Sequence, residues 1–538
     1  KLAYVDAVST PARYGQRYFY SRSRADAEKP IVCMREVATP ENPEPVERVL
    51  IDPNLWPIEG HLSLGVTQPS PDGKLLAYAL HKNGEDEATL HLLEVDSGRS
   101  LELDVIPGAK YAYPSFTPDG DGFYYTFLPA EERTADGVRA IPAPERPAHA
   151  EVRYHRIGTD PKSDPLVYGK TGSRERFLVP ELSRNGQLLT LYIHHGWSST
   201  DVYLCAVGHR RGVTIDCFSP LAGDEEACKA RFQPLCQGRS ARYQVLAHGP
   251  LLFLITDDGA PQGRVLLAPL AEVLAHGPLD DTLYPFRQLI PEDPKAVIED
   301  VRLIGGKLVV HVLSRAQSRL RVYEPNGELL DAPELPGIGS IGAISGTPEE
   351  PELFVSYSSF TMPPTVLRGR VDEKTPLSRW AAVEPPVGVD LSKLRTEQVF
   401  YRSADGTEIS MFLVYRRDLD RDCNAPVVLS GYGGFNISLR PEWTPFVIPL
   451  LARGGLLAVP NLRGGGEYGE AWHQAGTKLS KQNVFDDFIA AAEWLIAKNS
   501  ARAGNIVAEG RSAGGMLIGA VTNMRPDLWA GVIGGVPF

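Results

Sequence analysis

The sequence has few cysteines, no excess of positive charge and no long apolar run, and each of these shortages excludes a class of protein. Six cysteines in 538 residues are too few for a fold that depends on disulfides. Lys and Arg total 55 against 67 Asp and Glu, and no basic stretch is present that would bind a nucleic-acid backbone. No apolar segment reaches the length of about 18 residues that a transmembrane helix needs. We therefore expect a monomeric, cytoplasmic protein that binds neither nucleic acid nor membrane.

Four of the cysteines lie close together, but their spacing is wrong for a metal site. Cys205, Cys217, Cys228 and Cys236 lack the closely spaced pairs of ligands that zinc sites use. We interpret them as free thiols in a reducing compartment and expect neither a metal nor another cofactor. The chain opens at Lys1, without Met and without a signal-peptide pattern, so we expect the natural N-terminus to lie further upstream.

Glycine and proline are plentiful, and many of them fall in turns that recur along residues 1–375. Each turn precedes an alternating or apolar run, a polar turn and a second such run, which is the pattern of paired strands. The clearest turns are Ser70–Gly73, Thr117–Gly120 and Ser183–Gly186; an early copy is Tyr14–Arg17, and weaker copies begin near His248, Gly305 and Thr347. This recurrence predicts a seven-bladed β-propeller over residues 1–375. A set of unrelated β-sandwich domains is the alternative, because the period is irregular.

Two segments account for much of the irregularity. Pro129–Ala150 holds several prolines and charges, and Gly208–Ala241 interrupts the pattern between the fourth and fifth copies. Both have the composition of surface loops rather than of a core. We therefore expect them to be loop insertions.

The pattern changes after residue 375. Residues 376–396 have the composition of a linker, and from 397 to 538 strand patterns alternate with helical ones. Such alternation predicts an α/β domain, with a mostly parallel sheet and helices on both faces. The expected strands are Glu397–Arg402, Glu408–Tyr415, Val427–Ser430, Leu456–Pro460, Asn505–Glu509 and Gly531–Val536, and the expected helices are Pro445–Ala452, a helix capped by Asn483 that carries Phe485 to Ile496, and Gly514–Asn523.

Ser512 lies in the pattern Gly-x-Ser-x-Gly, between a predicted strand and a predicted helix. A sharp strand-to-helix turn crowds the chain around it, so its neighbours must lack side chains, and it lifts the serine hydroxyl above the sheet. The helix that follows directs its N-terminal amides and the positive end of its dipole at an incoming carbonyl. This context favours a nucleophilic serine over a glycine-rich turn with an incidental serine.

A serine nucleophile needs a base and an acid, and in this architecture they follow the serine in the chain, the acid first and the His last. No His lies between Ser512 and Phe538. We therefore expect the catalytic domain to be truncated at its C-terminal end in this chain, with the catalytic Asp and His beyond Phe538.

Two further features of this domain are interpreted as structural. His473 is the one His after residue 397, but it precedes Ser512, which is the wrong order for a triad. In the loop from Arg463 to Glu467, the glycines allow tight turns and the two charged residues are expected to form an ion pair.

Several longer stretches identify a family. These are Gly431–Asn436, Asn461–Gly469, Lys481–Asp487 and the turn at Ser512. With them the chain resembles the prolyl oligopeptidase family of serine peptidases over nearly its whole length. The resemblance implies an α/β-hydrolase domain capped by a seven-bladed propeller, and an oligopeptidase that cleaves peptides of limited length through an acyl-enzyme on Ser512.

The resemblance also implies roles for individual residues. Ser512 corresponds to the family's nucleophile. Tyr432 corresponds to a tyrosine whose hydroxyl forms the oxyanion hole together with the backbone N–H of the residue after the nucleophile, here Ala513. Phe435 corresponds to an aromatic of the specificity pocket, where a proline ring would stack, although simple core packing fits it equally well. Tyr111 corresponds loosely to a propeller aromatic near the same pocket.

The resemblance leaves the specificity divided. Arg511 and Ala513 flank the serine, where prolyl-specific members carry Gly and Asn, and this turn is similar to that of oligopeptidase B, which cleaves after Lys or Arg. Cleavage after proline is favoured because Phe435 offers a ring rather than a charge. Two other classes compete: a non-catalytic propeller that serves as a binding platform, and an esterase or lipase on the same hydrolase fold.

Overall fold

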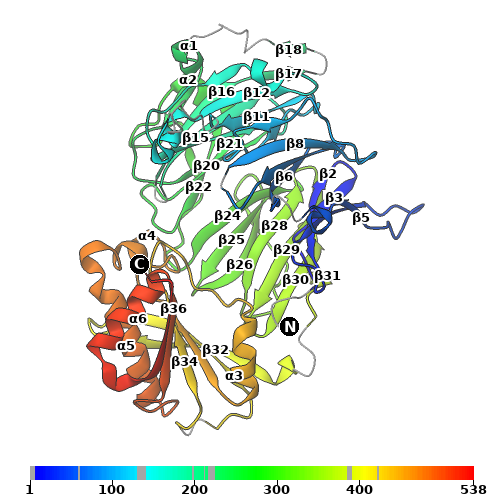
Figure 1. Ribbon diagram of the computed structural model, residues 1–538. Coiled ribbons are helices and arrows are strands. Elements are labelled where there is room, and N and C mark those ends of the chain that lie inside the picture. Colours follow the sequence, from blue (N-terminus) through cyan, green and yellow to red (C-terminus); the bar gives the residue numbers. More distant parts are fainter. Residues whose placement is uncertain are drawn as a thin grey trace.

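The computed structural model describes residues 6–57, 61–85, 87–129, 141–196, 199–210, 213–215, 225–384, 390–420 and 423–537. The first part of the chain forms a propeller, drawn in blue to yellow-green in Figure 1, and the last part forms an α/β domain below it. The segment expected to be an insertion at Pro129–Ala150 lies partly outside the described residues; its described part contains a 3-10 helix.

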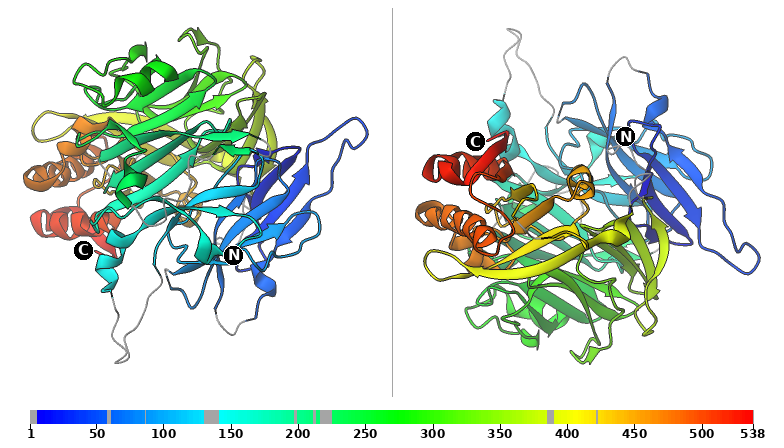
Figure 2. Two further views of the ribbon diagram at one scale, coloured as in Figure 1. Left: turned by 90° about the horizontal axis from the view of Figure 1, so that it is seen from above. Right: turned by 90° about the horizontal axis from the view of Figure 1, so that it is seen from below.

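Seven antiparallel sheets make up the propeller, as predicted. Figure 2 shows them arranged around a common axis. The first blade contains β1 Ala7–Val8, β2 Ala12–Tyr14, β3 Arg17–Ser23, β4 Ile31–Glu36 and β5 Arg48–Ile51; the second contains β6 Ser63–Pro69, β7 Leu75–His81, β8 Ala88–Glu94 and β9 Ile106–Pro107; and the third contains β10 Ser115–Phe116, β11 Gly122–Phe127, β12 Glu151–Arg156 and β13 Leu166–Tyr168. The fourth blade contains β14 Arg176–Leu182, β15 Leu188–His195, β16 Ser199–Ala206 and β19 Gln233–Cys236, and the fifth contains β20 Tyr243–His248, β21 Leu251–Thr256, β22 Arg264–Pro269 and β23 Arg287–Ile290. The sixth blade contains β24 Val297–Ile304, β25 Lys307–Ser314, β26 Gln317–Tyr323 and β27 Leu329–Leu330, and the seventh contains β28 Ser340–Thr347, β29 Glu350–Ser359, β30 Met362–Arg370 and β31 Ser378–Ala382.

The repeated turns owe their shape to one hydrogen-bond pattern. In the turn Ser70–Gly73, the Ser70 hydroxyl donates to Asp72 Oδ1 at 2.7 Å and accepts from the Leu75 N–H at 3.0 Å. The turns Thr117–Gly120 and Ser183–Gly186 bond in the same way. Because the last position has a positive φ of +72° in the first turn, it takes glycine. These side-chain bonds explain why the repeat is visible in the sequence.

The prediction that Gly208–Ala241 is a loop insertion is wrong in part. Its last third contains β19, which pairs with β16 as the outer strand of the fourth blade. The hairpin of β17 (Gly208–Arg210) and β18 (Val213–Ile215) and the short helix α1 (Glu225–Lys229) precede that strand. An outer strand pairs on one side only and needs little apolar alternation, so its pattern is weak.

The second and third blades are joined by a buried histidine between two carboxylates. His155 on β12 is fully buried, and its Nδ1 and Nε2 each lie 2.9 Å from an oxygen of Asp164 and Asp104, respectively. Tyr125 donates a further hydrogen bond of 2.8 Å to Asp164. Burial alone lowers the pKa of His155, but the bonds to Asp164 and Asp104 outweigh it and the pKa is raised. In its charged form the imidazolium donates a hydrogen bond to both carboxylates.

Replacing this histidine should destabilise the propeller in a pH-dependent way. His155→Gln is expected to lower the free energy of unfolding by about 3 kcal/mol at pH 6, because two buried carboxylates lose a charged partner. Since the folded pKa is raised, the imidazolium's contribution is complete below the unfolded pKa of about 6.5 and is lost as the pH rises through the folded value. Chemical denaturation of both proteins from pH 5 to 9 measures this, and a pH-independent difference would refute it.

The α/β domain contains a six-stranded sheet in the order β32-β33-β35-β34-β36-β37. The strands from β35 to β37 are parallel, whereas β32 and β33 are antiparallel additions. The strands are β32 Leu394–Arg402, β33 Glu408–Arg416, β34 Val427–Ser430, β35 Leu456–Pro460, β36 Ile506–Arg511 and β37 Trp529–Gly535, and the helices are α3 Ile448–Ala452, α4 Glu470–Gln474, α5 Gln482–Ala497 and α6 Ala513–Met524. The propeller adds α2 Leu270–His276, and 3-10 turns occur at Pro53–Leu55, Ala143–His149, Pro161–Ser163, Leu391–Lys393, Pro445–Val447, Lys478–Ser480 and Pro526–Leu528.

Helices cover both faces of this sheet, as expected. The helices α5 and α6 lie side by side (Figures 1 and 2), and their apolar side chains pack on the face that presents Met411 and Leu413. The opposite face, with Phe412, packs against α3 and against Phe360 and Ala316 of the propeller. The apolar core on this second face of the sheet therefore contains residues of both domains. No helix in the described part of the chain is long and apolar enough to cross a bilayer.

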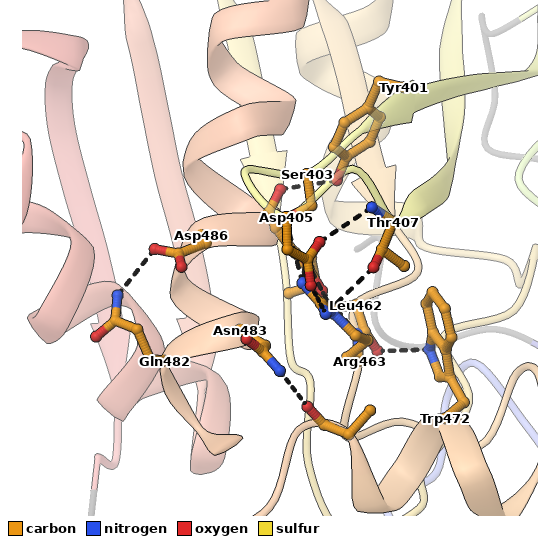
Figure 3. A network of polar contacts seen from close by, with 12 residues as sticks. Tyr401, Ser403, Asp405, Thr407, Leu462, Arg463, Trp472, Gln482, Asn483 and Asp486 are labelled. Carbon is orange, nitrogen blue, oxygen red and sulfur yellow. Dashed lines mark hydrogen bonds and ion pairs between the residues drawn. The ribbon is translucent and has the colours of Figure 1, made fainter. Parts of the chain in front are cut away.

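Two local expectations differ from the structure. The stretch 376–396, expected as the linker, contains β31 of the last blade and the start of β32, so only residues 383–393 separate the two sheets. Helix α5 begins at Gln482, and Asn483 is not its cap. The Asn483 side chain instead donates to the carbonyl of Ala475 at 2.9 Å, an acceptor that lies in the preceding loop (Figure 3).

Candidate active site

Ser512 lies at the junction of β36 and α6, in the strained turn that its pattern predicts. Its φ is +54°, in the left-handed region, at a cost of about 1–3 kcal/mol for a residue with a side chain. A Cβ on Gly510 would lie 2.5 Å from the carbonyl oxygen of Gly514, and one on Gly514 would lie 2.4 Å from that of Gly431. Both positions therefore require glycine, and the crowding holds the serine at the N-terminus of α6.

Tyr432 and Ala513 come together although 81 positions separate them. The loop Gly431–Asn436 follows β34, which pairs directly with β36. A Cβ added to Gly434 would lie 3.1 Å from Cβ of Ala513 and 3.9 Å from Cε1 of Tyr432. The loop thus runs over the first turn of α6, which places a half-buried tyrosine and a backbone amide of the helix N-terminus beside each other.

Phe435 lies on the wall of a cavity between the two domains. Its side chain is 51% exposed, which excludes the core-packing interpretation. It shares a cavity of about 420 Å³ with Ala513, Met516 and Lys481 of the α/β domain and with His195 of the propeller. The cavity is therefore bordered by the turn at Ser512 and by a blade end.

The loop that starts at Arg463 is fixed by a charged network, part of which is drawn in Figure 3. The Arg463 guanidinium bonds Asp487 at 2.6 Å and also pairs with Asp405. The hydrogen bond from Arg463 lowers the pKa of Asp405 to about 2. The ion pair expected between Arg463 and Glu467 is therefore wrong, because the arginine is directed at α5 and at the turn between β32 and β33.

Glu467 has a different environment. It is 1% exposed and accepts a hydrogen bond of 2.7 Å from the Leu439 N–H. Burial raises the pKa of its carboxyl to about 7. Close by, Arg440 lies 3.6 Å from Glu299 of the propeller, so a charged contact joins the domains next to this loop.

The remaining candidates lie outside the Ser512–Tyr432 pair. His473 on α4 places Nδ1 2.9 Å from the Gly464 carbonyl oxygen and 3.1 Å from the backbone nitrogen of Asn436, so the ring bridges two loops, as expected for a structural residue. Tyr111 packs edge-on against Phe177 of the fourth blade at 5.6 Å. Sequence reasoning missed His195 and Lys481 as cavity residues. His195 belongs to no recognisable local pattern, and Lys481 enters only as the first residue of the stretch Lys481–Asp487 that identifies the family.

A propeller that covers an α/β-hydrolase domain, with a serine in a strand–turn–helix elbow, defines a propeller-capped serine hydrolase. Comparison with known proteins gives the family. The model of the prolyl oligopeptidase N-terminal β-propeller domain matches residues 1–378, and that of the prolyl oligopeptidase family matches residues 442–538. The chain therefore belongs to the prolyl oligopeptidase family and is a serine-type peptidase.

Individual relatives agree with this. The chain is 28% identical over 526 residues to a prolyl endopeptidase of Elizabethkingia meningoseptica, covering 97% of the chain and 68% of that protein. A solved structure from a study of two prolyl endopeptidases and their inter-domain dynamics is 39% identical with a TM-score of 0.85, covering 99% of this chain and 72% of that one. Prolyl oligopeptidase B from Galerina marginata, bound to a 25mer macrocyclization substrate, is 25% identical with a TM-score of 0.83, over 99% and 72%.

Proposed function

We propose that the protein is a serine endopeptidase that cleaves short peptides on the carboxyl side of proline. The observation that carries the proposal is the exposed ring of Phe435 on the cavity that reaches Ala513, next to Ser512. An aromatic ring stacks well on a pyrrolidine ring, whereas a carboxylate would suit the charge of a lysine or arginine better. Relatives named prolyl endopeptidases support the same specificity.

In the proposed mechanism Ser512 attacks the carbonyl carbon of the proline residue in the substrate. The carbonyl oxygen becomes negative in the tetrahedral intermediate, and the Tyr432 hydroxyl and the Ala513 N–H donate hydrogen bonds to it. Collapse of the intermediate breaks the peptide bond, releases the amine and leaves an acyl-enzyme on Ser512, which water then hydrolyses. A general base takes the proton of the Ser512 hydroxyl during the attack and delivers it to the leaving amine.

Specificity is tested by measuring the cleavage of peptides with proline, lysine or arginine before the cleaved bond, by the unmodified enzyme and by Phe435→Ala. The full-length enzyme should prefer proline to lysine or arginine before the cleaved bond, and Phe435→Ala should lower kcat/KM for the proline peptide by about 10–100-fold because the stacking ring and its buried area are lost. The effect should appear mainly in KM. The control is Tyr113→Ala, an exposed aromatic of the propeller that does not line this cavity. Equal cleavage of all three peptides by the unmodified enzyme would reject the proposed specificity.

We further propose that the propeller restricts the substrates to peptides of limited length. The cavity is lined by His195 of the propeller and by Phe435 of the α/β domain, and the domains are held by a shared apolar core and by the Arg440–Glu299 contact. An extended peptide can enter when the domains separate, whereas a folded protein cannot. Closure also excludes water from the reaction.

A size comparison tests this restriction. An eight-residue peptide should be cleaved with a kcat/KM at least about 100-fold higher than a folded protein that displays the same sequence in an exposed loop, because the folded body cannot pass the propeller. The same protein, unfolded and alkylated, is the control for sequence context. Equal kcat/KM for the peptide and the folded substrate would reject the restriction and leave the hydrolase assignment untouched.

A further inference from the structure

A lysine that the proposed mechanism does not use holds the loop of Tyr432 and Phe435 in place. Lys481 directly precedes α5, and its Nζ donates a hydrogen bond of 2.6 Å to the Gly433 carbonyl. Burial lowers the pKa of this ammonium below its ordinary value. The same side chain lines the cavity with Phe435 and Ala513. Within the described residues, the ammonium beside the site thus has one hydrogen-bond partner, the Gly433 carbonyl.

The loop needs such support because its backbone is strained. Phe435 and Asn436 both have positive φ values, +53° and +57°. Each costs about 1–3 kcal/mol for a residue with a side chain, so the surroundings must hold this conformation. The Asn436 N–H is directed at two acceptors, His473 Nδ1 at 3.1 Å and the Gly464 carbonyl oxygen at 3.2 Å. On the N-terminal side of Phe435 and Asn436, the hydrogen bond from Lys481 to Gly433 holds the loop in the same way.

The peptide that Lys481 binds also has little room to move. A Cβ on Gly433 would lie 2.4 Å from Cγ1 of Val484 on α5, and one on Gly464 would lie 2.7 Å from the Gly433 carbonyl oxygen. The Gly433 peptide is therefore clamped between α5 and the loop at Arg463. Tyr432 is the preceding residue, so the direction of the Gly433 carbonyl fixes the backbone from which the tyrosine ring projects.

We propose that Lys481 is a positioning residue of the oxyanion hole, which holds the Tyr432 hydroxyl in place by binding the Gly433 carbonyl. The inference rests on the proposed function, since it assigns Lys481 to the support of a group that acts in that reaction. A charge-assisted hydrogen bond is about twice as strong as a neutral one, which suits a contact that must resist loop strain. Lys481 acts through the loop and does not itself bind the substrate's charge.

A double-mutant cycle in the full-length enzyme tests the proposal. Lys481→Met should lower kcat on a proline peptide by about 10–100-fold with KM within about twofold, because misplacing a catalytic donor by 1 Å has an effect of this size. In a Tyr432→Phe background the same change should alter kcat by less than about threefold, since the hydroxyl that it positions is gone. Lys481→Arg, which keeps a charged donor, should restore part of kcat.

Lys498→Met is the matched control. Lys498 follows the last residue of α5, is exposed and does not line this cavity, and its ammonium makes no hydrogen bond or ion pair within the residues that the structure describes. It should therefore leave kcat and KM unchanged. If Lys481→Met unfolds, Lys481→Gln, with a shorter neutral donor, replaces it in the cycle.

The outcomes separate this inference from the proposed function. Suppose that Tyr432→Phe lowers kcat, and that Lys481→Met lowers kcat by the same factor in the Tyr432→Phe background as in the unmodified enzyme. The proposed function then stands and the positioning role is rejected. A rise in KM at constant kcat for Lys481→Met also rejects it and makes Lys481 a substrate-binding residue. If Tyr432→Phe itself leaves kcat unchanged, the proposed mechanism fails at its own residue.

Discussion

Ser512→Ala in the full-length enzyme should reduce kcat/KM for a proline peptide by at least about 10⁴-fold, because removal of a catalytic serine leaves only the oxyanion hole and substrate binding. The protein should nevertheless remain folded. The Ser512 side chain makes no capping hydrogen bond to α6, and the strain at its φ of +54° is the same for alanine. Comparison of kcat/KM with the thermal unfolding midpoint separates these effects.

The control for this prediction is Ser480→Ala. Ser480 belongs to the same domain, and its hydroxyl makes no hydrogen bond within the described ranges, so activity should be unchanged. A fluorophosphonate probe should label the unmodified enzyme and spare Ser512→Ala. Retention of more than about a tenth of kcat by Ser512→Ala, a barrier change below 1.4 kcal/mol, would contradict the nucleophilic role.

The parts of the fold that the sequence predicts are those whose signal is local. The turn Ser70–Gly73 repeats a side-chain hydrogen bond across two residues, and the turn at Ser512 requires glycine within two residues on either side. The strands Val427–Ser430 and Leu456–Pro460 are apolar runs of the length of buried strands, and their bounds agree with the structure. β19 was missed because an outer strand shows no such run.

The errors concern interactions whose partner is chosen by packing. Arg463 has Glu467 four residues away, but α5 brings Asp487 to its guanidinium, and the turn after β32 brings Asp405. Glu467, Asp487 and Asp405 are all acidic, so the sequence alone does not show which of them pairs with Arg463, and the fold determines it. Lys481 is a similar case: at the start of an amphipathic helix a lysine is typical of a solvated residue, and its bond to Gly433 depends on where the loop after β34 crosses α5.

Tyr432→Phe should lower kcat by about 10²–10³-fold with little change in KM, because one donor to the oxyanion is lost and the charge that it binds exists only in the transition state. The substitution removes no hydrogen bond of the folded state, since the Tyr432 hydroxyl makes none to any residue that the structure describes, so stability should be nearly unchanged.

The Ala513 N–H remains in the variant and explains why the loss should stop short of that of Ser512→Ala. It belongs to the first turn of α6, where the amide has no partner inside the helix and the dipole adds to its field. Tyr401→Phe is the control, because that hydroxyl is buried and donates to the Asp487 carbonyl at 2.8 Å, away from Ser512. It should reduce stability and spare kcat. A rise in KM at constant kcat for Tyr432→Phe would instead make Tyr432 a residue that binds the ground state, and the oxyanion hole would then need a different second donor.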